Sequence, residues 1–95
     1  MSIQQSVGFE WDENKRQRNV EKHGIDFLIA AEVFDGRAVV THYSPRSRED
    51  RWATVGELNG RLCVVVWTER ATNRRIIAAY RADEGDERKY RQVHG

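Results

Sequence analysis

Two groups of residues have the chemistry to handle an anionic substrate. Between Arg61 and Arg81 the chain has five arginines and one carboxylate, Glu69, which leaves a local excess of +4. Guanidinium groups bind and stabilise anionic oxygens, and histidine, present near the start as His23, is the side chain that titrates nearest neutral pH. A basic patch is one reading of the arginines. Solvated positions on an antiparallel sheet explain them equally well.

The segment from Trp11 to Gly24 reads as a helix that has very little to bury, because only Trp11 and Val20 are apolar. At 100° per residue, one flank of this helix collects basic and amide groups. These are Lys15, Arg18, Asn19, Lys22 and His23. Val20 lies opposite, so we expect the helix to contact the protein through Val20 and Trp11 and to offer the basic flank outward or into a cleft. A solvated helix supported by i, i+4 charge pairs is the alternative.

Composition limits the kind of protein in which these residues can act. A chain of 95 residues with 39% hydrophobic residues supports one modest core, which we expect at residues 9–93 behind a disordered tail at 1–8. The net charge of +1 argues against a protein that coats nucleic acid over its whole surface. No membrane span and no signal peptide is recognisable, so a cytoplasmic protein is expected. Cys63, alone in an apolar run, is expected in the core.

The elements that would position these groups follow from caps, periodicity and turns. Asp12 can cap a helix that ends at Gly24, and Asp26 can cap a second, amphipathic one over 27–36. Strands are expected at 37–43, 51–58, 61–70 and 74–82, a short one is possible at 9–11, and 83–93 reads as a final helix. The sequence predicts an α+β domain with two N-terminal helices, a four-stranded antiparallel sheet and a short C-terminal helix. Helices would cover one face of the sheet and leave the other open.

Asn59-Gly60, between two β-rich runs, is a strong hairpin signal. A two-residue loop pairs Leu58 with Arg61 and places Trp52 opposite Trp67. The two tryptophans could form a stacking platform, but large aromatics are most often buried, which favours a core position. The register of the last hairpin, and hence the face on which Arg75 and Arg81 lie relative to Glu69, is not fixed by the sequence.

The stretch FEWDENKRQRNVEKHGIDFLIAAEVF resembles the opening signature of the BrnT family of bacterial toxins, F-x-W-D-x-x-K-x-x-x-N-x-x-K-H-G-x-x-F-x-x-A-x-x-V-F. Twelve positions match at fixed spacing, from Phe9 to Phe34. The likeness continues through RWATVGELNGRLCVVVWTER and RRIIAAYRA to about Tyr90. Departures from the family pattern are Ala78 where Ser is usual, Tyr80 where Arg is frequent and Asp86 where Glu is common.

The resemblance implies a RelE-like fold and a toxin of a type II toxin–antitoxin pair that inhibits growth by cleaving RNA. A BrnA-type antitoxin would neutralise it, and promoter DNA would be bound only indirectly, through the antitoxin. On this view Lys15, Asn19 and His23 of the opening helix face a shared cleft. No membrane partner is implied.

Cleavage of this kind needs neither metal nor cofactor, because the RNA 2′-hydroxyl is itself the nucleophile. The predicted catalytic residues are His23 as acid or base, Glu69 as rival base, Arg75 and Arg81 for charge stabilisation, and Tyr90 for phosphate binding or proton transfer. The predicted RNA-binding residues are Lys15, Arg18, Asn19, Lys22, Arg70 and Arg74. Structural roles compete with these assignments: His23 could cap its helix, Tyr90 could pack in the core, and Glu69 could pair with Arg75 or Arg81.

Two alternatives drop the catalysis. In one, the basic face binds the antitoxin, and the protein acts mainly within an autoregulating complex. In the other, a small RNA-binding module stacks bases on Trp52 or Trp67, although the spaced aromatic motifs of common RNA-binding modules are missing.

Overall fold

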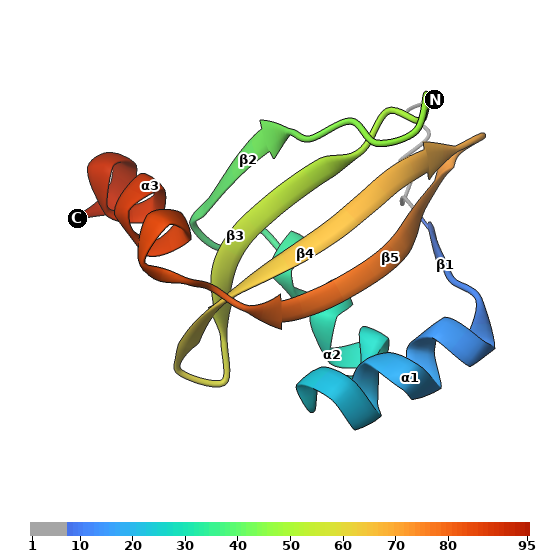
Figure 1. The fold of residues 1–95 in the computed structure, drawn as a ribbon. Helices are drawn as coiled ribbons and strands as arrows, with labels where there is room; N and C mark the ends of the chain where they lie inside the picture. The colour runs from blue at the N-terminus through green and yellow to red at the C-terminus, as the bar shows by residue number, and fades with distance from the viewer. Residues whose placement is uncertain (1–7) are drawn as a thin grey trace, which may run out of the picture.

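The structure, a computed structural model, describes residues 8–95, and its centre is a five-stranded sheet in the order β1-β5-β4-β3-β2 (Figure 1). The N-terminal tail expected at residues 1–8 lies outside the described residues except for Gly8, which belongs to the first strand. The elements are β1 (Gly8–Glu10), α1 (Glu13–His23), α2 (Phe27–Ala30), a 3₁₀ helix η1 (Ala31–Phe34), β2 (Val39–Tyr43), β3 (Trp52–Leu58), β4 (Arg61–Arg70), β5 (Asn73–Arg81) and α3 (Glu84–His94).

The α+β class is confirmed, and the sheet differs from the prediction in having a fifth strand, which forms at Gly8–Glu10 where a short strand was expected as possible at 9–11. The strands β2 to β5 pair antiparallel in series, and β1 adds a fifth strand that runs parallel to β5. Three residues of β1 suffice because Glu10 fastens them: its carboxylate accepts hydrogen bonds from Asn73 at 3.1 Å and from Arg75 at 2.8 Å. Beyond these residues, no strand within residues 8–95 pairs with the edge of β5.

The second predicted helix, 27–36, is in fact two short pieces, because the chain tightens from α2 into η1 at Ala31. The tightening brings Val33 close to β3 at Gly56, where an added Cβ would lie 2.5 Å from Val33 Cγ2. Phe27, Ala30 and Val33 are buried, so the predicted apolar stripe does face the core. The segment therefore does not form one ideal α-helix, because the 3₁₀ turn of η1 brings Val33 close to Gly56.

The predicted hairpin register is confirmed. Leu58 pairs with Arg61, and Trp52 pairs with Trp67, with the two rings stacked at 5.2 Å between centroids. Trp67 is buried and its indole Nε1 donates to Thr54 Oγ1 at 2.8 Å, while Trp52 is half-buried. Trp67 is therefore a core residue and offers no free face to a base.

The sheet carries a packed cluster on each face, so the prediction of one wholly open face is wrong. On one face α2 and η1, with Trp11 and Ile25 from the segments on either side of α1, cover Leu58, Cys63, Val65 and Ile76. On the other, Tyr90 of α3 packs against a smaller cluster built on Ala53, Val55 and Val64, with α3 standing over the β2 end of the sheet (Figure 1). Cys63 is buried, as expected.

Helix α1 is attached to the sheet by a polar contact, through the flank that was expected to face outward or into a cleft. Asn19 is 6% exposed, and its amide donates to Ala79 O and to Ile25 O at 2.8 Å while its carbonyl accepts from Ala79 N at 3.1 Å. Val20, expected to contact the protein, is 42% exposed. The amide of Asn19 takes the place of the missing strand beside β5, because it both donates to and accepts from the backbone of one edge residue.

Candidate active site

A groove runs between α1 and the uncovered edge of β5. Its volume is about 270 Å³, and its floor is Ile77 and Ala78 of the strand. The wall from α1 consists of Lys15, Arg18, Asn19, Lys22 and His23. Helical spacing predicts that these five residues share one flank of a helix, and in the structure that flank lines a hollow.

A second hollow, of about 420 Å³, begins where the groove ends. It lies between the end of α1, the segment through α2 and the β3–β4 turn. Arg61 and Arg81 line one side of it, Ile25, Ile29 and Leu58 are its apolar walls, and His23 belongs to this lining as well. Among the residues that the structure describes, His23 is the one histidine that borders both hollows.

The cations around the two hollows are not neutralised by the protein. Within residues 8–95, ion pairs involve Arg16, Arg37, Arg51, Arg70, Arg75 and Arg91. None involves the five cations of the two hollows, Lys15, Arg18, Lys22, Arg61 and Arg81. The carboxylate in the lining, Asp26, is bound by Arg16 at 2.8 Å, and these hydrogen bonds hold the pKa of Asp26 below its usual value. The site is therefore electropositive.

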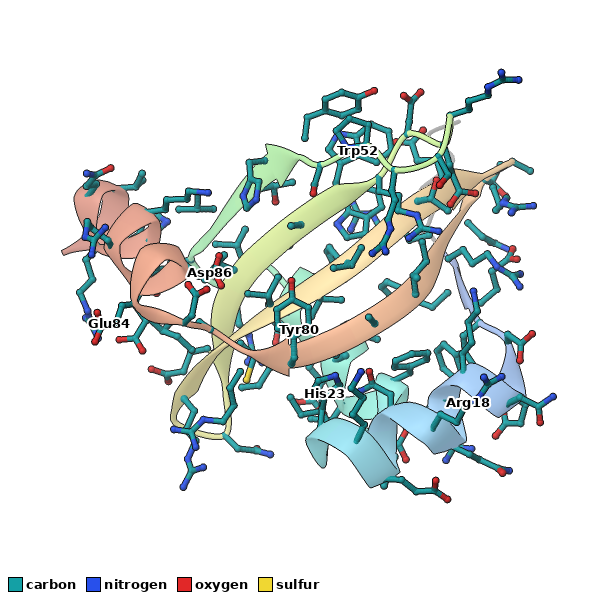
Figure 2. All side chains as sticks on the ribbon, in the orientation of Figure 1. Arg18, His23, Trp52, Tyr80, Glu84 and Asp86 are labelled. Carbon is teal, nitrogen blue, oxygen red and sulfur yellow. The ribbon has the colours of Figure 1, made fainter. Side chains whose placement is uncertain are left out.

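His23 packs against Tyr80, with 5.8 Å between ring centroids at a tilt of 46°. Figure 2 shows Tyr80 standing on the sheet face near Asp86, with His23 at the end of α1 beyond β5. Burial raises the pKa of the Tyr80 hydroxyl, and the charges of Asp86 and Asp83 raise it further. At neutral pH this hydroxyl is thus protonated and can donate a hydrogen bond.

The predicted charge-stabilising pair, Arg75 and Arg81, is separated by the sheet itself. Arg75 pairs with Thr68 and Arg81 with Cys63, and positions five apart on β4 point to opposite faces. On β5 the two arginines are six apart and would share a face, but the register shifts between Val66 and Trp67, which leaves an extra residue in β5. Arg75 is held by Glu10, whereas Arg81 lines the second hollow.

Glu69 is far from Arg81. It pairs with Arg74, six residues along β4 from the partner of Arg81, which at 3.3 Å per residue is about 20 Å. Within residues 8–95, the ion pair with Arg75 or Arg81 that was the structural alternative for Glu69 is not present. Arg75 binds Glu10 instead.

Three further predicted residues have structural partners. The Arg74 guanidinium carbon lies 4.5 Å from the centre of the Phe34 ring and 4.9 Å from that of Trp67. The Arg70 guanidinium lies 3.4 Å from a carboxylate oxygen of Glu49. Tyr90 packs in the smaller cluster, with its ring 5.0 Å from that of His94. None of the three borders either hollow.

Sequence reasoning missed Arg61 as a site residue. It was counted in the basic excess, but a signal for its position was available, since a two-residue turn places Arg61 beside Leu58 on the helix-covered face. It also missed Glu10, whose role depends on the parallel pairing of β1.

Within residues 8–95, no group of three histidine, cysteine or acidic side chains is arranged to hold a metal ion. No described helix is long and apolar enough to cross a membrane. No curated protein matches the chain. A family model does match, over residues 11–86, and its description reads "Ribonuclease toxin, BrnT, of type II toxin-antitoxin system". With most of its length matched, including α1, both hollows and the whole sheet except β1, the chain belongs to this family of ribonuclease toxins.

Proposed function

We propose that this ribonuclease cuts RNA at His23, where the α1–β5 groove meets the second hollow, by a metal-independent reaction. The observation that carries the proposal is the position of His23 in the lining of both hollows, among five cations that form no ion pair within residues 8–95. An RNA backbone laid along the groove passes the imidazole before it reaches Arg81. The finer assignment of the fold as RelE-like is part of this proposal and is supported by the sequence resemblance.

The reaction needs two proton transfers and charge stabilisation. The 2′-oxygen bonds to phosphorus as its proton leaves to a base, and the bond from phosphorus to the 5′-oxygen breaks as that oxygen gains a proton. The products are a 2′,3′-cyclic phosphate and a 5′-hydroxyl. His23 carries out one of the two transfers, a contribution of about 10²- to 10⁴-fold. Arg81 donates to the non-bridging oxygens, which carry the developing charge.

The roles of the other predicted residues follow from their surroundings. Lys15, Arg18 and Lys22 bind phosphates along the groove. Asn19 is a positioning residue, because its amide is spent on Ala79 and Ile25. Glu69, Arg70, Arg74, Arg75 and Tyr90 lie outside the proposed site.

As a toxin of a type II system, the protein has an antitoxin as partner and RNA as substrate. The proposal adds that the antitoxin is of the BrnA type, that the complex reaches promoter DNA through the antitoxin, and that the toxin acts in the cytoplasm. Sequence resemblance supports these additions.

The test is cleavage of total RNA by antitoxin-free protein in the presence of EDTA, with analysis of the new ends. Cyclic phosphate and 5′-hydroxyl ends that form in EDTA support the reaction as written. Dependence on an added divalent cation, or 5′-phosphate ends, would overturn it.

A further inference from the structure

We infer that the second hollow is a nucleobase subsite that selects the nucleotide beside the cleaved bond. The inference rests on the proposed function, because it takes His23 as the point of cleavage. It goes further in giving the two hollows different tasks: the groove holds the backbone, and the second hollow reads a base.

The two hollows differ in the walls they offer. The groove is shallow and dominated by cations, which bind phosphates of any sequence. The second hollow is larger, at about 420 Å³, within the range of about 300–1,000 Å³ typical of small-molecule sites. Ile25, Ile29 and Leu58 give it apolar surface against which a flat ring can pack. A phosphate alone gains nothing from such surface, whereas a base does.

The charges of the second hollow suit a nucleotide. Arg61 and Arg81 stand at the sheet end of the lining and can bind the phosphate attached to the base. Asp26, the carboxylate of the lining, is already bound by Arg16 through two hydrogen bonds, so it does not repel that phosphate as a free carboxylate would.

Asn59 supplies a group that can read a base edge. Its φ of 52° and that of Gly60, 80°, belong to the tight turn between β3 and β4, and this geometry favours asparagine and glycine. Asn59 is exposed in this turn and lines the hollow, so its side-chain amide can reach a ligand there. An amide can both donate and accept, as base edges require.

In the first experiment, calorimetry measures the affinity of the antitoxin-free protein for six ligands. These are the four nucleoside 3′-monophosphates, inorganic phosphate and ribose 5-phosphate. At least one nucleotide should bind about tenfold or more tighter than either control, the gain expected from packing one base. Equal binding of the nucleotides and both controls would overturn the subsite.

Variants locate the binding. Ile29→Phe fills the hollow from α2 and should abolish the advantage of nucleotide over phosphate, whereas Leu28→Phe, on the same short helix but 57% exposed and outside the lining, should keep it. Asn59→Gly suits the left-handed turn and removes only the amide, so it should weaken the preference among bases without unfolding the protein.

Mapping the cut sites in a random RNA library separates failure of the subsite from failure of the proposed function. If His23→Ala abolishes cutting and both Ile29→Phe and Asn59→Gly leave the base preference at the cut unaltered, the subsite is wrong and the proposed function stands. If His23→Ala cuts as the unaltered protein does, the proposed function is wrong, and nucleotide binding then shows only that the hollow binds a ligand.

Discussion

Asn19 shows how one side chain can replace an apolar interface. Helix α1 has a charged surface and little to bury, yet its position decides where Lys15, Lys22 and His23 lie. The Asn19 amide fixes that position by pairing with both backbone groups of Ala79. This contact explains how a helix with almost no apolar face can be held against the sheet. The rest of the same flank is left for charged groups.

Asn19→Ala should lower the free energy of unfolding by about 1–3 kcal/mol, because it leaves buried backbone groups of Ala79 without a partner. Urea unfolding monitored by tryptophan fluorescence measures the loss. Gln17 is exposed on the same helix, so Gln17→Ala is the matched control. It should change the free energy of unfolding by less than about 0.5 kcal/mol. Equal unfolding midpoints for the two variants would show that α1 is held by something other than Asn19.

At the scale of elements, local signals predicted most of the fold. Asp12 and Asp26 cap their helices, and Asn59-Gly60 sets the register that pairs Trp52 with Trp67. These features depend on residues a few positions apart, or on one turn that fixes a whole ladder. The short β1, by contrast, was expected only as a possible strand at 9–11, because its pairing depends on Glu10 meeting Asn73 and Arg75, more than 60 residues away.

The candidate site was only partly predictable for the same reason. The basic flank of α1 could be read from helical spacing, and that flank does line a groove. The face of Arg75 could not be read, because one extra residue in β5 reverses the alternation between Arg75 and Arg81. Helical spacing predicted which residues share the flank, but not whether the flank faces the sheet or the solvent. The usual preference is reversed here, because the Asn19 amide is buried and the Val20 side chain is exposed.

The segment between η1 and β2 gives the stability of the fold a pH dependence. Asp35, at the end of η1, accepts hydrogen bonds from the Arg37 guanidinium at 2.6 and 2.8 Å, which lowers the pKa of Asp35 from 3.8 to about 2. As pH falls from 3.8 toward 2, the unfolded chain takes up this proton before the folded one does, so the stabilising contribution is lost across that window.

Asp35→Asn should remove this part of the acid dependence. Urea midpoints measured from pH 5 to 2 should fall less steeply for the variant than for the unaltered protein between about pH 4 and 2. Parallel curves would mean that the Asp35–Arg37 contact does not contribute to acid stability.

At the scale of the whole molecule, a net charge of +1 conceals a strong local field. Many arginines are neutralised within the fold, as Arg16, Arg37 and Arg75 are by nearby carboxylates. The cations that form no ion pair in the described part of the chain include those that line the two hollows beside His23. A small protein can in this way bind RNA at one place without being basic over its entire surface.

RNA affinity should therefore fall steeply with salt. If the five cations of the two hollows each neutralise one phosphate, the log–log slope for a single strand is about −3.5. A 2′-O-methyl oligonucleotide, which has no free nucleophile, allows binding to be measured without cutting. Lys22→Gln should reduce the slope by about 0.7, and Lys89→Gln, on α3, should not. The same slope for both variants would place RNA elsewhere.

The most direct test compares the cleavage rates of His23→Ala and Arg75→Ala, since these residues represent the α1–β5 junction and the other face of the sheet. Both variants must first be shown to fold and to bind the antitoxin. His23→Ala should slow single-turnover cleavage by about 10²-fold or more, while Arg75→Ala retains most of the rate. Cleavage that survives in His23→Ala and is lost in Arg75→Ala would contradict the account and move the active site to the face that carries Arg75.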